Sequence, residues 1–151
     1  MTNKEKLVKL NFNLPEDWHG VGSESLWAEK TFDNKLLVRN TPFYVKGVSF
    51  MDKVDFYSKD NNLFFNQVVE KGGHSTYRIS RISGINVGNF ELYWKPIQNL
   101  GCSYESKSGV SYLYAVDIPL EVNVNKVYEL LQKEEDNIWS FEEAGYYKKL
   151  E

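Results

Sequence analysis

Residues 70–78, with the sequence EKGGHSTYR, bring together residue types that could do chemistry. His74 could act as a general base, with Ser75 or Cys102 as the nucleophile that it activates. Ser75 cannot easily be the nucleophile that His74 activates, because neighbouring residues of a strand point to opposite faces of a sheet. Cys102 is expected to open the neighbouring strand, which could bring it close to His74. Such a hydrolase would also need an orienting group and an oxyanion hole.

A structural role is the alternative for this histidine. The sequence around Cys102 shows no glycine-rich nucleophile turn, and Gly101 is more simply explained as the end of a helix. In this interpretation His74 and Thr76 complete hydrogen bonds at the end of a β-ribbon. We favour the structural role and keep open a pocket, for a small ligand or for hydrolysis, that is formed by His74, Thr76, Arg78 and Cys102.

The sequence gives no indication of a metal or cofactor site. Its two histidines and one cysteine, at His19, His74 and Cys102, are too few and too dispersed for a structural zinc site. The glycine-containing segments HGVGS and SGINVGN lack a P-loop lysine and a dinucleotide fingerprint. We therefore expect neither a metal nor a cofactor.

Negative charge is concentrated in one segment near the C-terminus. Residues 129–143 hold six acidic residues and one lysine, a local net charge of −5 in a chain whose net charge is −3. A charge run of this kind is commonly a solvated helix end with its aromatic residues in the core. Alternatively it is a docking surface, on which carboxylates steer a basic protein and an aromatic side chain anchors it. The residues of this candidate surface are Glu134, Glu135, Asp136, Trp139, Glu142 and Glu143.

The first half of the chain has the patterns of short strands. The segment LVKLNFNL alternates apolar and polar residues, which is typical of a half-buried strand. Four more strands are predicted around hairpin turns at Asp33-Asn34 and at KDNN. The segment TPFYVKGVSFMD is apolar but is interrupted by Pro42 and Gly47, which favours a packed crossing segment over a helix. Residues 1–72 are therefore expected to form a small curled sheet or barrel.

The second half changes to a mixed pattern. In NFELYWKPIQNLG the apolar residues recur on one helical face, with Asn89 as a cap and Pro96 as a kink or early end. CSYES and SYLYAVDI predict strands, NVNKVYELLQKEE predicts a helix capped by Asn123, and NIWSF predicts a last strand or tail. From His74 the order is strand, helix, strand, strand, helix, strand, which is the ferredoxin-like split βαβ order. The predicted class is α+β, with residues 73–151 as a second lobe in one compact unit.

Several segments occur together in a recognisable order from about Trp27 to Trp139: LWAE, LLVRNTPFYVKGVSFMDKV, VVEKGGHSTYR, LGCSYE and YAVDIP. In these segments the chain resembles a bacterial family that is known as a domain of unknown function, number four-two-six-five. Membership in this family implies no activity and no catalytic residue.

Composition narrows the function classes further. One cysteine fits a reducing cytoplasm, and a net charge of −3 provides no basic field for nucleic acid. No apolar run reaches the roughly 18 residues of a membrane span. We therefore expect a cytoplasmic, non-enzymatic protein-binding module, most concretely an immunity protein that neutralises a bacterial toxin. The alternative is a small-ligand-binding protein or hydrolase with a pocket near His74 and Cys102.

Overall fold

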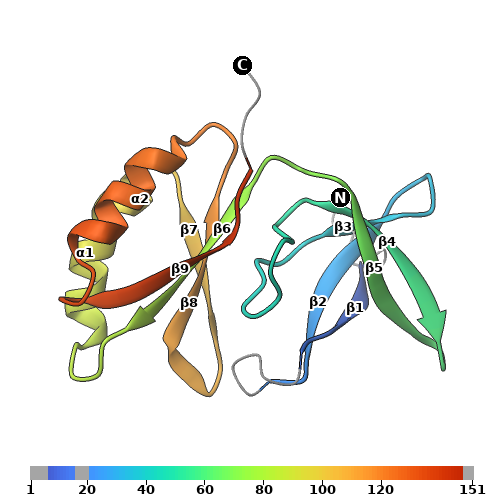
Figure 1. The fold of residues 1–151 in the computed structure, drawn as a ribbon, viewed down its shortest axis with the longest axis horizontal. Coiled ribbons are helices and arrows are strands. Elements are labelled where there is room, and N and C mark those ends of the chain that lie inside the picture. Colours follow the sequence, from blue (N-terminus) through green and yellow to red (C-terminus); the bar gives the residue numbers. More distant parts are fainter. Residues whose placement is uncertain (1–6, 16–20, 148–151) are drawn as a thin grey trace.

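The computed structural model describes residues 7–15 and 21–147. These residues form a barrel, a four-stranded sheet and a pair of helices, arranged as three layers with the sheet in the middle (Figure 1). The elements are β1 (Leu7–Asn13), β2 (Ser23–Lys30), β3 (Leu36–Val38), β4 (Lys53–Lys59), β5 (Asn62–Glu70), β6 (Ser75–Arg81), α1 (Val87–Asn99), β7 (Ser103–Lys107), β8 (Val110–Ile118), α2 (Val124–Lys133) and β9 (Trp139–Gly145).

The first five strands form the small barrel that the alternating pattern predicts. Neighbouring strands pair antiparallel from β1 to β5, and β1 closes the barrel by pairing parallel to β5. Asn34, Asp60 and Asn61 adopt positive φ at the two hairpin turns, a conformation that Asn and Asp tolerate better than most residues. The barrel interior is filled by the apolar residues of each alternation, including Leu10 and Phe12 of β1.

The remaining strands form a sheet in the order β7-β8-β6-β9, and each neighbouring pair is antiparallel. This is the ferredoxin-like arrangement that the element order predicts. Both helices lie on one face of the sheet (Figure 1), where Trp94 of α1 and Leu131 of α2 are fully buried. Leu130 is only partly buried beside them.

The ends of α1 differ in detail from the sequence prediction. Asn86, and not Asn89, caps the helix, and its side chain accepts a hydrogen bond from the Asn89 backbone N–H at 2.8 Å. Pro96 does not end the helix early, since α1 continues to Asn99. Pro96 lies in the last turn, so only the end of the helix loses a backbone hydrogen bond. Asn123 caps α2 as predicted.

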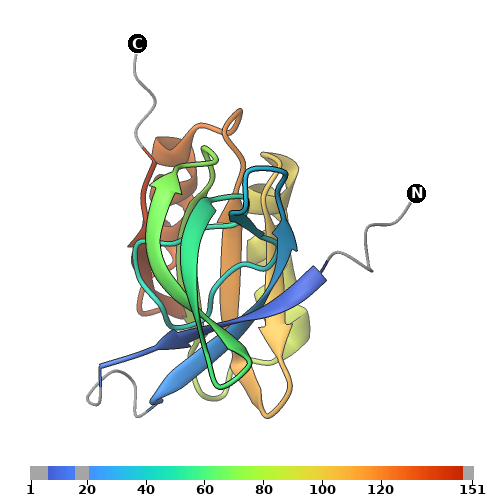
Figure 2. The same cartoon turned by 90° about the vertical axis from the view of Figure 1, so that its right-hand side faces the viewer.

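The second face of the sheet is covered by the barrel and by residues 41–50, the crossing segment between β3 and β4. Figure 2 shows the barrel in front of the sheet, with β9 along one margin. Consequently the first five residues of β6 are all buried, although they alternate between the two faces. Among the described residues, no helix has the length and apolar character needed to cross a membrane.

Candidate functional site

Two buried charged side chains hold the crossing segment from either side of its backbone. The Glu24 carboxylate of β2 accepts hydrogen bonds from the backbone N–H groups of residues 43–45, at 2.6–3.0 Å. Arg78 of β6 donates to the carbonyl oxygens of Tyr44, at 2.9 Å, and Val45. The peptide unit between Tyr44 and Val45 therefore links a barrel carboxylate to a sheet guanidinium.

Arg78 is buried at the interface of the barrel and the sheet, with an exposed fraction of 2%. Burial lowers the pKa of its guanidinium, and the nearby carboxylates Glu142 and Glu24 oppose that shift. Its Nη1 lies 3.5 Å from the Glu142 carboxylate of β9. Its Nε is buried and finds no hydrogen-bond partner within the described part of the chain.

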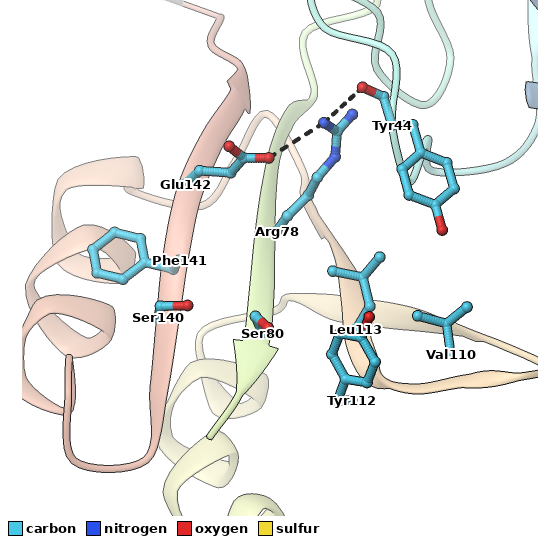
Figure 3. A pocket seen from close by; sticks show the side chains of 9 residues that line it. All are labelled: Tyr44, Arg78, Ser80, Val110, Tyr112, Leu113, Ser140, Phe141 and Glu142. Carbon is cyan, nitrogen blue, oxygen red and sulfur yellow. Dashed lines mark hydrogen bonds and ion pairs between the residues drawn. The ribbon is translucent and has the colours of Figure 1, made fainter. Parts of the chain in front are cut away.

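A pocket of about 390 Å³ lies beside this arginine, between the sheet and the crossing segment. Figure 3 shows the Arg78 side chain extending toward Tyr44 and Glu142, with Ser80 and Ser140 on neighbouring strands below it. The lining residues are Tyr44, Arg78, Ser80, Val110, Tyr112, Leu113, Ser140, Phe141 and Glu142. This lining offers hydrogen bonds and apolar contact, and it includes no histidine or cysteine that could pair with a serine.

His74 lies just before β6 and binds a carboxylate on β8. Its Nδ1 is 2.8 Å from Oδ1 of Asp117, and its ring makes an edge contact with Phe50 of the crossing segment. Burial raises the pKa of Asp117, and the bond to His74 opposes that rise. His74 therefore completes the hydrogen bonds of a buried acid where the barrel meets the sheet.

The structure does not bring His74 and Cys102 together as the base and nucleophile that the sequence left open. Cys102 packs in the core between the sheet and the helices, whereas Asp117 and Thr76 belong to the sheet face that meets the barrel. Burial raises the pKa of the Cys102 thiol to about 12, so it is protonated at neutral pH and a poor nucleophile. Of the four residues of the alternative pocket, Arg78 lines the cavity beside the crossing segment, and His74, Thr76 and Cys102 lie outside its lining.

The rest of the EKGGHSTYR segment also joins the two layers. Asp52 accepts hydrogen bonds from the backbone N–H groups of Ser49 and Gly72, both at 2.9 Å, and from the Lys71 ammonium at 3.3 Å. The Thr76 hydroxyl donates to the Ser49 hydroxyl at 2.6 Å. We call this group of residues, together with His74 and Asp117, the junction. Its geometry supports the structural interpretation of the motif.

Sequence reasoning missed several polar residues of this region. Glu24 was not singled out, although it falls on the same strand positions as the buried residues Leu26 and Ala28. Asp117 also was not singled out, although it interrupts the apolar run of β8. An acid at a position that the alternation assigns to the interior is therefore the signal that could have found them.

The prediction that Trp139 anchors a partner on the acidic segment is wrong. Trp139 is fully buried, at 0% exposed, and its Nε1 donates a hydrogen bond to the Leu131 carbonyl oxygen at 2.8 Å. Its ring packs edge-on against Phe90 of α1. Trp139 is a core residue, and it is not available as an anchor for a partner.

The acidic residues themselves are divided between two places. Glu134, Glu135 and Asp136 lie in the turn between α2 and β9, where Glu135 and Asp136 are exposed and Glu134 is partly buried. Glu142 faces the barrel side and approaches Arg78, whereas Glu143 is exposed on β9. The sequence thus grouped residues that the fold places at both ends of β9 and on different faces.

Two exposed tyrosines accompany Glu143. Tyr128 of α2 is 41% exposed and packs edge-on against Phe141, and Tyr146, just after β9, is 45% exposed. Glu143 lies opposite Tyr77 in the β6–β9 ladder, and the Phe141 ring contacts Tyr77 as well as Tyr128. Burial raises the pKa of Tyr77 to about 12, and Glu143, Tyr128 and Tyr146 add to this rise. We call Tyr128, Phe141, Glu143 and Tyr146 the β9 edge surface.

Metal binding receives no support from the described residues, which contain no group of three or more His, Cys, Asp or Glu side chains placed to hold an ion. His19, one of the two histidines, lies outside these residues.

Comparison with known proteins places the chain in a family. The family described as "Domain of unknown function (DUF4265)" matches residues 24–141, which is most of the chain. The chain belongs to the DUF4265 family. A comparison with curated proteins finds no match. The matched range of the DUF4265 family includes Glu24, the crossing segment and the junction as far as Asp117.

A solved structure shares the fold. It is described as "Novel crystal structure of a hypothetical protein from Neisseria gonorrhoeae", and it is 19% identical, with a TM-score of 0.78. The similarity covers 92% of this chain and 94% of that chain. At this identity the likeness shows the fold, in which the same barrel-and-sheet architecture recurs.

Proposed function

We propose that this protein is a cytoplasmic, non-enzymatic protein-binding module that recognises a basic partner through the β9 edge surface. Its most concrete version is an immunity protein that neutralises a bacterial toxin by covering a basic face. The observation that carries the proposal is the pair of exposed tyrosines, Tyr128 and Tyr146, beside the exposed carboxylate of Glu143. Tyrosine is enriched at protein interfaces, because its ring gives apolar contact and its hydroxyl gives a hydrogen bond.

The distribution of charge supports a basic partner. The segment from 129 to 143 carries −5, so the remainder of the chain carries +2, from −3 minus −5. A partner with a basic face is therefore attracted toward α2, the turn that follows it and β9, which carry this charge. Complementary charge of this kind raises association rates and specificity more than it raises affinity.

Affinity capture tests this proposal. The immobilised protein is used to capture partners from the source bacterium, and binding of the captured protein is compared among Tyr128→Ala, Tyr146→Ala and a control, Tyr57→Ala. Tyr57 lies on β4 of the barrel and is 45% exposed, which matches the other two tyrosines. We expect each β9-side substitution to weaken binding by about tenfold or more, because an interface tyrosine commonly contributes over 1 kcal/mol. Equal binding by all three variants, or no captured protein, would contradict the proposal.

Binding of a small ligand is the second candidate function. The pocket beside Arg78 has a volume of about 390 Å³, within the range of ligand sites, and the unpartnered Nε of Arg78 is a donor that a ligand could satisfy. The position of Cys102 gives no support to hydrolysis in that pocket. A ligand in the pocket would be seen as a rise in melting temperature that Leu113→Trp, which fills the pocket, abolishes.

A further inference from the structure

The backbone of β9 has an open side. β9 is an edge strand of its sheet, with β6 as its one neighbour. The Ile82 backbone N–H donates to the Ile138 carbonyl oxygen at 3.0 Å. This bond shows which residues of β6 and β9 form hydrogen-bonded pairs. In an antiparallel ladder, hydrogen-bonded and non-hydrogen-bonded pairs alternate. Ser80–Ser140 and Arg78–Glu142 are therefore the bonded pairs, and the backbone groups of Phe141 and Glu143 point away from β6.

On either side of Phe141 and Glu143, outward backbone carbonyl groups are bonded within the chain itself. The carbonyl oxygen of Trp139 accepts a hydrogen bond from the Asp136 N–H at 2.8 Å, and the carbonyl oxygen of Ala144 accepts one from the Gly47 N–H at 2.8 Å. Between these points, no backbone partner for Phe141 or Glu143 is found within residues 7–15 and 21–147. Two residues thus present N–H and C=O groups in the arrangement that a further strand requires.

Charge decides between the possible occupants of this edge. A second copy paired across β9 would bring its own −5 segment against the first, and like charges facing each other across a strand pair are destabilising. A basic strand has the opposite effect, because its cationic side chain would meet Glu143 on the β9 edge surface, which also holds exposed tyrosine rings. A cation over such rings gains a further attraction.

We propose that the partner adds a basic, extended segment to β9 as a fifth strand of the sheet. The backbone groups of Phe141 and Glu143 form hydrogen bonds to that segment, and the side chains of these two residues determine which sequences bind. On the helix side, a lysine or arginine lies beside Glu143, and an apolar residue two positions away lies beside Phe141, since side chains two apart share a face. This inference rests on the proposed function and gives its mode of binding.

The test uses a short synthetic peptide in which threonine alternates with arginine, valine and lysine. Amide resonances of the protein are followed by NMR as the peptide is added. We expect the largest shifts, and slower amide exchange, at Phe141 and Glu143. Two N-methylated peptides serve as matched probes: methyl groups on one edge block the hydrogen bonds to β9, and those on the other edge leave them intact. We expect one methylated peptide to lose at least about tenfold in affinity and the other to bind like the parent.

A protein variant separates the backbone from the charge. Glu143→Pro removes the outward N–H and leaves the β6 ladder untouched, whereas Glu143→Ala removes the carboxylate alone. Binding that is weaker for Glu143→Pro than for Glu143→Ala supports strand addition, and equal losses contradict it. Shifts that map elsewhere, no shifts, or indifference to N-methylation would also overturn it. A captured protein that binds through Tyr128 and Tyr146 but is indifferent to Glu143→Pro would leave the proposed function standing and remove strand addition.

Discussion

His74 is a structural partner of a buried acid, and its removal should be felt in stability. Asp117 is 7% exposed, and the His74 ring is the hydrogen-bond partner of its carboxylate. We expect His74→Ala to lower the free energy of unfolding by about 1 kcal/mol or more, because it leaves a buried acceptor without its donor. Urea unfolding measures this loss, and partner binding should be nearly unchanged. Loss of binding with wild-type stability would contradict the structural role.

The same substitution has a predictable pH dependence. Burial raises the pKa of Asp117 above 3.8, so the folded protein holds this proton more tightly, and stability falls as the pH rises above that value. His74 opposes the shift, and Glu105 and Glu121 add to it. Without His74 the folded pKa rises further, so the cost of His74→Ala should be larger at pH 7 than at pH 4. Adding Asp117→Asn should remove most of this difference.

At the scale of single residues, burial was the property that sequence reasoning judged least well. Trp139 stands in an acidic segment and was proposed as an exposed anchor, yet its ring fills the core beside Phe90. Local charge does not determine which face of β9 a side chain occupies, because alternation places neighbours on opposite faces. Glu24 and Arg78 are buried for a reason that the sequence hides: each binds backbone groups of a segment that is distant in sequence.

At the scale of elements, Gly72 of the junction lies close against the backbone of Met51. A Cβ on Gly72 would lie 2.2 Å from the Met51 carbonyl oxygen, and a backbone atom cannot easily move away. We expect Gly72→Ala to destabilise the protein by about 1–3 kcal/mol through overpacking. Gly22→Ala is the control, because a Cβ there meets nothing within 4 Å, and it should change stability by less than about 0.5 kcal/mol. Equal thermal stability of the two variants would show that the junction can relax.

The elements themselves were largely predictable. Alternation, hairpin turns and helical periodicity located the strands and both helices, because these patterns are local in sequence. The parallel pairing of Leu10 with Leu63, which closes the barrel, was not predicted, since it joins residues far apart in the chain. The cap of α1 was misplaced from Asn86 to Asn89, because both residues can accept the capping bond and the fold decides between them.

At the scale of the whole molecule, the sheet is covered on both faces. The sequence predicted two lobes in one unit, but it gave no indication that the barrel packs against the sheet face opposite the helices. That contact combines an apolar cluster of Phe43, Tyr44 and Ala115 with polar residues of β6. Thr76 donates a hydrogen bond to Ser49, and Arg78 donates to the carbonyl oxygens of residues 44 and 45. With both faces covered, a further strand can join the sheet only at an edge strand, β7 or β9, and β9 is the edge at which we propose that the partner binds.

Recruitment of a basic partner by the acidic residues of β9 and of the turn before it is tested by association kinetics. Stopped-flow association with the captured partner is measured over a salt series for the wild type and for a variant that carries Glu134→Gln, Glu135→Gln, Asp136→Asn and Glu143→Gln. Surface charges are screened beyond about 8 Å at physiological salt. We expect the wild-type association rate to fall steeply with salt, the neutralised variant to respond weakly, and dissociation to change less. The control variant, Glu70→Gln, should behave like the wild type. Association that is indifferent both to salt and to the four neutralisations would contradict the claim.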